Sequence, residues 1–206
     1  MRKSYLILIL LCSTAFTFAQ TINYGIKAGL NLSNQYIDNG YSAGDGKNVI
    51  GFNAGVIVAI DFSKFFIEPG LFYTTKGEKF VIIVPSANPK TPIVYNGSKR
   101  LNYIELPVNV LYKLKLLPGG DIHLGGGPYI GYGVSENGSV NGESISGPFN
   151  KFAHNPDYGV NFIVGAKLMN KFIVDINYGL GLANLSGEGE TQENRVLSFS
   201  VGYLFR

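Results

Sequence analysis

Cysteine, tryptophan and histidine are scarce in this sequence. The 206-residue chain has one cysteine, two histidines and no tryptophan. The single cysteine, Cys12, lies in an N-terminal segment that we expect to be removed, so the mature chain has no thiol for a disulfide, a thiolate metal site or a nucleophile. Two separated histidines are also too few for a metal centre, which needs three or four converging ligands. The sequence therefore predicts neither a metal nor another cofactor.

Charge is equally sparse, at 15% of residues, with a formal net charge of +3. Two of the basic residues, Arg2 and Lys3, fall in the expected leader, and without them 15 basic residues face 14 acidic ones. No basic run carries interleaved aromatic residues, so we expect no nucleic-acid partner. Disorder is also excluded, because Gly, Tyr and Phe are abundant where a disordered chain would be charged and poor in aromatics.

Long apolar runs are absent beyond the first residues. A short apolar run, Tyr5–Leu11, follows the basic start, and Thr17-Phe18-Ala19 then forms a small-x-small site. We therefore expect residues 1–19 to be a signal peptide cut between Ala19 and Gln20, and residues 20–206 to be one domain. The large Leu11 before Cys12 argues against lipidation. No later stretch reaches transmembrane-helix length, so a membrane protein of this sequence must be a closed barrel.

Alternation with a period of two residues is the strongest signal present. In eight segments one parity is large and apolar while the other is small or polar, which is typical of strands. No charge falls on the apolar parity, where it would cost a few kcal/mol in lipid. The third segment is the least regular, because Phe66 and Phe72 fall on the polar parity. The segments are Ile22–Asn31, Gly51–Asp61, Phe65–Thr74, Asn102–Leu114, Ile122–Gly133, Asp157–Leu168, Phe172–Gly181 and Val196–Phe205.

The connections between these segments alternate between long and short. Residues 32–50, 75–101, 134–156 and 182–195 are long and polar, whereas the intervening links are only a few residues. Outer-membrane barrels have short periplasmic turns and long external loops. The sequence therefore predicts an all-β, eight-stranded antiparallel up-and-down transmembrane barrel in the outer membrane, with both termini periplasmic.

That topology predicts two aromatic girdles at the membrane interfaces, where amphipathic rings are favoured. We expect the periplasmic girdle to contain Tyr24, Tyr112, Phe172, Tyr203 and Phe205. We expect the outer girdle to contain Phe52, Tyr73, Tyr132, Tyr158 and Tyr178.

The inward parity carries charges that have two interpretations. Glu68 and Glu105 fall on adjacent strands at similar expected heights, which is the arrangement of a paired-carboxylate acid/base site. Structural pairing with Lys27 or Lys167 is the preferred interpretation, because an unpaired buried charge is costly. The expected structural lumen cluster comprises Lys27, Glu68, Glu105, Lys113, Lys167 and Asp175.

An enzyme site at the outer rim would rest on His154, which lies near Asp157, Ser144 and Ser146. A hydrolase or acyltransferase could use such groups, but no nucleophile-elbow motif accompanies them. The other histidine, His123, falls near the periplasmic end of the expected lumen. We therefore predict no catalytic residue and no enzymatic activity.

Several short motifs follow one another along the mature chain in an order that is more specific than any one motif alone. They include Gly25-x-Lys27-x-Gly29-Leu30-Asn31, Phe66-Ile67-Glu68-Pro69-Gly70-Leu71-Phe72-Tyr73, Asn102-Tyr103-Ile104-Glu105-Leu106-Pro107, Gly126-Gly127-Pro128-Tyr129, Asp175-Ile176-Asn177-Tyr178-Gly179-Leu180-Gly181 and Gly202-Tyr203-Leu204-Phe205. In these the chain resembles the PorT-like outer-membrane barrels. The resemblance implies an outer-membrane barrel, and some relatives are linked to a protein secretion and gliding apparatus. The chain ends on Arg206, where barrels commonly end on an aromatic residue.

The function predicted from the sequence is a non-enzymatic structural, adhesive or envelope-accessory role through the external loops. The alternatives are an accessory part of a secretion or assembly complex, a narrow pore, a rim-site lipid or peptide enzyme, and a soluble binder. Eight strands leave an interior about wide enough for side chains alone, which disfavours a pore. The partners expected are outer-membrane lipid, the barrel-assembly machinery and, for the secretion alternative, other envelope proteins. The sequence pattern does not specify whether the protein is a monomer or an oligomer.

Overall fold

A computed structural model describes residues 21–38, 43–84, 93–117, 119–147, 156–186 and 190–205. Every regular element within these ranges is a β-strand. No helix among these residues is long and apolar enough to cross a membrane. The strands are β1 (Thr21–Asp38), β2 (Ala43–Asp45), β3 (Val49–Asp61), β4 (Phe65–Val84), β5 (Ile93–Leu117), β6 (Gly120–Val140), β7 (Glu143–Gly147), β8 (Asp157–Leu168), β9 (Phe172–Gly181) and β10 (Thr191–Phe205).

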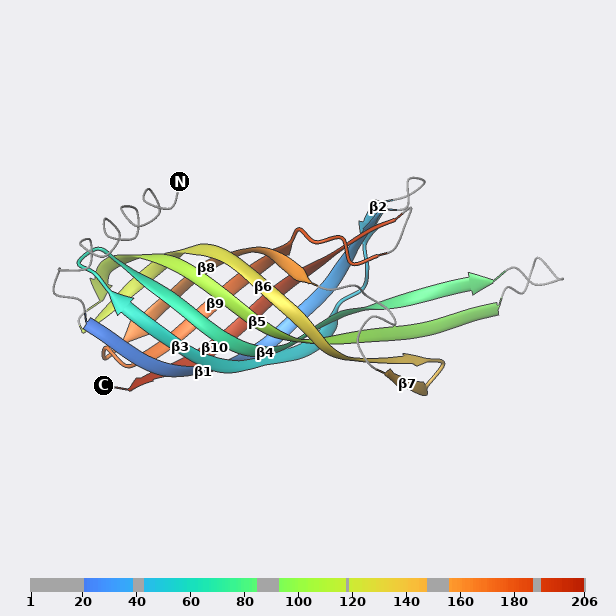
Figure 1. The fold of residues 1–206 in the computed structure, drawn as a ribbon, viewed down its shortest axis with the longest axis horizontal. Helices are drawn as coiled ribbons and strands as arrows, with labels where there is room; N and C mark the ends of the chain where they lie inside the picture. The colour runs from blue at the N-terminus through green and yellow to red at the C-terminus, as the bar shows by residue number, and fades with distance from the viewer. Residues whose placement is uncertain are drawn as a thin grey trace, which may run out of the picture.

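Eight of these strands close into one antiparallel ring. The order β1-β3-β4-β5-β6-β8-β9-β10 follows the chain, and β10 pairs back onto β1 from Tyr24↔Phe205 to Asp38↔Thr191. The short strands β2 and β7 add to β1 and β6 outside the ring. Figure 1 shows β1 beginning and β10 ending at the same end of the barrel. The predicted eight-stranded up-and-down fold is therefore confirmed.

The two faces of the ring are inverted relative to a soluble protein. Large apolar side chains point outward and lie exposed on the protein surface, as at Leu30 (61%) and Val164 (59%). Polar side chains of the opposite parity point inward and are buried, as at Asn31 and His123, both at 0%. Such an exterior suits lipid, because the closed ring leaves no unpaired sheet edge.

The short connections are tight. The turn between β8 and β9 places Met169 and Asn170 in the left-handed region, at φ 52° and 56°. The Lys171 N–H donates to the Leu168 carbonyl at 3.0 Å and closes this tight turn, in which asparagine tolerates the left-handed conformation well. The three short turns, β3–β4, β5–β6 and β8–β9, form the end of the barrel that faces the periplasm in this class of protein.

The long connections differ from the expectation that they are polar loops. The β4–β5 ladder runs on from Thr74↔Tyr103 to Val84↔Ile93, and β6 pairs with β5 as far as Gly97↔Val140. These strands project beyond the barrel as an external sheet (Figure 1). Outside lipid the outward face need not be apolar, so the alternation that marks a membrane strand fades while the backbone ladder continues.

Both expected aromatic sets lie at the outer surface of the ring. At the turn end, Phe172 contacts Tyr203 at 5.3 Å and Tyr203 contacts Phe205 at 5.4 Å between ring centroids. At the other end, Phe52 and Tyr73 lie 5.7 Å apart. Tyr24, Tyr112, Tyr132, Tyr158 and Tyr178 are exposed on the same outward face.

Candidate functional site: the barrel lumen

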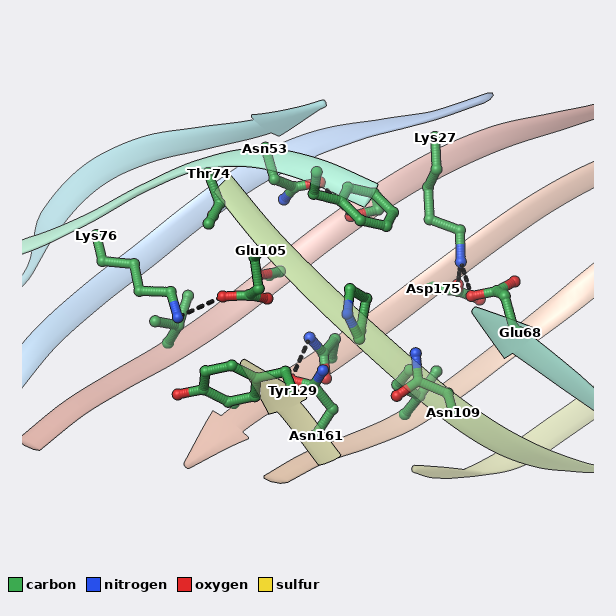
Figure 2. A pocket seen from close by; sticks show the side chains of 18 residues that line it. Lys27, Asn53, Glu68, Thr74, Lys76, Glu105, Asn109, Tyr129, Asn161 and Asp175 are labelled. Carbon is green, nitrogen blue, oxygen red and sulfur yellow. Dashed lines mark hydrogen bonds and ion pairs between the residues drawn. The ribbon is translucent and has the colours of Figure 1, made fainter. Parts of the chain in front are cut away.

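The middle of the lumen is crossed by one buried lysine. Lys27 of β1 lies 2.7 Å from Glu68 Oε1 of β4 and 2.6 Å from Asp175 Oδ2 of β9 (Figure 2). The other Asp175 oxygen is 2.7 Å from His123 Nε2 of β6. Gly165 of β8 leaves the space for this contact, because a Cβ there would collide with the Asp175 carboxylate. Four strands far apart in sequence are thus joined through charge-assisted bonds.

A second group surrounds Lys76, nearer the external end. Its ammonium lies 2.5 Å from Glu105 Oε2 and 3.0 Å from Asp157 Oδ2. It also sits over the Tyr129 ring, 4.2 Å from the centroid, which favours a cation. Asn194 donates to Asp157 at 2.9 Å, so β10 joins the same network.

A third group lies at the periplasmic mouth. Asp61 accepts from Lys113 at 3.0 Å and lies 3.5 Å from the Lys167 ammonium. Lys167 is also 3.9 Å from Asp121. These contacts link β3, β5, β6 and β8 at the end where the short turns lie.

Amides and hydroxyls fill the space between the two inner charged groups. Asn31 is fully buried, donates to Thr74 Oγ1 at 2.9 Å and accepts from Asn53 at 2.7 Å and from Ser198 at 2.8 Å. A cavity of about 60 Å³ lies beside this belt, lined by residues of both charged groups (Figure 2). It is large enough for a few water molecules and far too small for an organic substrate.

An apolar layer closes the lumen between the Lys27 group and the mouth. Phe66, Leu111, Ile173 and Leu204 are each at most 3% exposed and belong to one buried cluster with Ile57, Ala59, Phe72 and Ile163. On β5, Leu111 lies between the inward positions Asn109 and Lys113. Phe66, which broke the predicted alternation, therefore points inward as its parity required, and it fills the barrel instead of facing lipid.

The expected lumen set is divided among the three groups. Lys27, Glu68 and Asp175 lie together, Glu105 binds Lys76, and Lys113 and Lys167 bind Asp61. Glu68 lies opposite Asn109 and Glu105 opposite Phe72, so the two carboxyl groups lie at different levels of the β4–β5 ladder. At that separation Glu68 and Glu105 do not form the paired-carboxylate acid/base site that the sequence allowed.

The sequence did not predict Lys76 or the contact of His123 with Asp175 as part of the lumen, and some predicted residues lie outside the described ranges. Lys76 lies two residues beyond the expected end of the third strand, yet continuing the parity of Phe72 and Thr74 would have placed it inward. The partnership of His123 with Asp175 joins positions 52 residues apart and had no local signal. Ala19, Gln20 and His154 lie outside the described residues.

The ion pair between Glu78 and Lys99 lies outside the membrane-spanning part. Glu78 and Lys99 face each other in the projecting hairpin, 3.5 Å apart. Burial raises the pKa of the Glu78 carboxyl and lowers the pKa of the Lys99 ammonium, and in each case the partner opposes the shift. Burial therefore offsets part of what the attraction between the two charges contributes to stability.

The chemistry of the lumen is that of a packed polar core. Over the described ranges, no group of three or more His, Cys, Asp or Glu side chains could hold a metal ion. The charges neutralise one another across strands, and the cavity between them admits only small polar guests. A closed, inside-out ring with such a core defines the class of small transmembrane β-barrels.

The chain belongs to the outer membrane protein beta-barrel domain family, whose model matches residues 18–187. Membership in this family locates it in the outer membrane. No curated protein matches the chain significantly. It is similar in structure to Ail, the attachment invasion locus protein of Yersinia pestis, with 14% identity, a TM-score of 0.45 and coverage of 89% of this chain and 98% of that one.

Two further solved structures are similar to the chain. Neisserial surface protein A shares 11% identity, with a TM-score of 0.44 and coverage of 88% and 97% of the two chains. A major outer membrane protein from Thermus thermophilus shares 13% identity, with a TM-score of 0.49 and coverage of 90% and 100%.

Proposed function

We propose that this protein is a non-enzymatic outer-membrane barrel with an adhesive or envelope-accessory role carried by its external sheet. The observation behind this proposal is the contrast between the two parts of the molecule. The lumen is filled by paired charges and an apolar layer, whereas β4, β5 and β6 extend outward as a ladder. Inner residues that bind one another leave the external surface as the part available to partners.

The surface of the hairpin suits contact with another macromolecule. Val81, Ile93 and Val94 are each more than two-fifths exposed near its outer end. Exposed apolar side chains outside lipid are typical of interaction sites. A two-stranded ribbon is also marginal by itself in water, so contact with a partner would stabilise it.

The finer identity of the protein rests on the sequence. We propose that residues 1–19 are a signal peptide removed before Gln20, and that the chain is a PorT-like barrel. The resemblance favours the alternative of an accessory part in a secretion or assembly complex. We also propose that the barrel-assembly machinery reads Phe205, the last aromatic residue of β10, despite the following Arg206.

The test is to remove the hairpin tip and keep the barrel. Replacing Phe80–Gly97 by an Asn-Gly turn would join Lys79 to Ser98, which already face each other in the ladder. We expect the shortened protein to keep the gel-mobility shift of a folded barrel on unboiled samples, and cells that display it to lose adhesion to surfaces and to one another. The control is Asn170→Gly in a periplasmic turn, where the left-handed φ suits glycine.

Each outcome has a distinct meaning. Loss of adhesion only in the hairpin variant supports the adhesive role. Unchanged adhesion with loss of co-purifying envelope proteins supports the secretion or assembly alternative. Adhesion and co-purification that both survive removal of the hairpin tip contradict the proposal.

A further inference from the structure

Each short turn of the barrel carries or adjoins a lysine. Lys64 lies in the β3–β4 turn, Lys115 lies near the end of β5 beside the β5–β6 turn, and Lys171 lies in the β8–β9 turn. Lys64 and Lys115 are exposed and Lys171 is half-buried. None of the three forms an ion pair with another residue that the structure describes.

The other charges of this rim neutralise one another. The remaining lysines, Lys113 and Lys167, are held by Asp61 and Asp121 inside the mouth. Those two aspartates are the acidic residues that the described part of this end contains. The excess positive charge therefore resides on Lys64, Lys115 and Lys171, which we call the rim lysines.

Aromatic residues adjoin the rim lysines along the chain, in or beside the short turns. Lys64 sits between Phe62 and Phe65, whose rings stack 4.6 Å apart. Phe65 lies opposite Tyr112 of β5, three residues before Lys115, and Lys171 directly precedes Phe172. Aromatic rings mark the membrane interface, and lysine stems reach from that level toward phosphate groups.

The described part of the external end has no comparable excess. Its basic residues are interspersed with more numerous acidic ones: Lys47, Lys79, Lys99, Arg100 and Arg195 against Asp38, Asp45, Glu78, Glu136, Glu143, Glu190 and Glu193. The asymmetry therefore directs anion attraction to the periplasmic rim.

We propose that the rim lysines bind the headgroups of anionic phospholipids in the periplasmic leaflet. The ring order places the three turns around the mouth, so the lysines surround the barrel instead of forming one compact patch. That distribution fits an annulus of separate lipid molecules better than a single protein or polymer partner. Each lysine near an anionic membrane surface strengthens association by about five-fold at moderate salt. This inference rests on the barrel and its orientation and is independent of the external role.

The experiment measures which lipids stay with the protein. The refolded full barrel is placed in phosphatidylcholine vesicles that contain a minor fraction of phosphatidylglycerol, transferred to mild detergent, and examined by native mass spectrometry. We expect phosphatidylglycerol to be enriched over phosphatidylcholine on the wild-type barrel, and the enrichment to fall as salt screens the charges. The variant K64Q/K115Q/K171Q should lose the enrichment, by about five-fold for each lysine removed, while K64R/K115R/K171R should keep it.

The matched control changes three exposed basic residues of the external end, as K47Q/K79Q/R100Q. We expect it to retain phosphatidylglycerol like the wild type. Equal enrichment in the rim and external variants would overturn the proposal, as would a wild-type barrel without preference for the anionic lipid. The mobility shift of unboiled samples shows that each variant is folded, so loss of lipid cannot be attributed to misfolding.

Discussion

Lys27 shows how a single side chain organises the interior. Its ammonium contacts Glu68 and Asp175, and all three residues are at most 7% exposed. In so little water, two carboxylates next to each other are tolerable only because a cation and His123 stand between or beside them. The free energy lost on replacing Lys27 therefore depends mainly on the two buried carboxylates, Glu68 and Asp175, that would lose their cation.

We predict that Lys27→Met destabilises the barrel by about 3–5 kcal/mol, because the substitution leaves two buried carboxylates without their cation. The measurement is urea unfolding from zwitterionic vesicles. Lys64→Met is the control, since Lys64 is exposed and its loss should change stability by less than about 0.5 kcal/mol. Matching unfolding midpoints for the two variants would show that the Lys27 group does not hold the strands together.

At the scale of the element, alternate residues of each strand face two environments, lipid outside the barrel and the lumen inside it. β8 was predicted with its observed bounds, Asp157–Leu168, because its whole length faces lipid on one side and the lumen on the other. β4 and β5 were predicted too short, because their outer parts leave the membrane and lose the apolar parity. Alternation thus measures how much of a strand is in lipid, not where the strand ends.

Val164 lies on the outward face of β8 and is 59% exposed on the protein surface. We predict that Val164→Lys weakens folding into vesicles by about 2–4 kcal/mol, because the charge would enter the hydrocarbon. Asn137→Lys, at an exposed position of the external part of β6, is the control and should fold like the wild type. A soluble barrel would tolerate both lysines, so equal folding of the two variants would contradict a lipid-facing exterior.

At the scale of the whole molecule, closure of the sheet makes the exterior a membrane surface and the interior a core. Eight strands enclose only enough space for side chains, and here those side chains are charged groups, amides and two buried apolar clusters. The polar content of the lumen therefore stabilises the closed ring and does not form an open channel.

We predict that the wild-type barrel shows no steady conductance in planar bilayers, because the apolar layer and the charge pairs fill its cross-section. Phe66→Ala combined with Leu111→Ala should admit water through the layer and raise the leak of small ions. The mobility shift on gels identifies preparations of the double variant that are folded. Large, stable openings in the wild type would refute an occluded lumen.

The sequence alone determined the class of protein and the approximate location of all eight ring strands. It could do so because lipid imposes one rule on every outward position, and a rule with a period of two residues can be read locally. The assignment of Phe66 and Phe72 to the inward parity followed from the same rule, although their apolar character interrupts the alternation.

Only the tertiary structure decided which charges meet. Lys27 contacts residues 41 and 148 positions away, and Glu105 pairs with Lys76 instead of Lys27 or Lys167. Such partnerships depend on the stagger between strands and on the closure of β10 onto β1, which sets the height of each side chain along the barrel axis. Parity specifies which way a residue points, but the level at which it lies is a property of the closed ring.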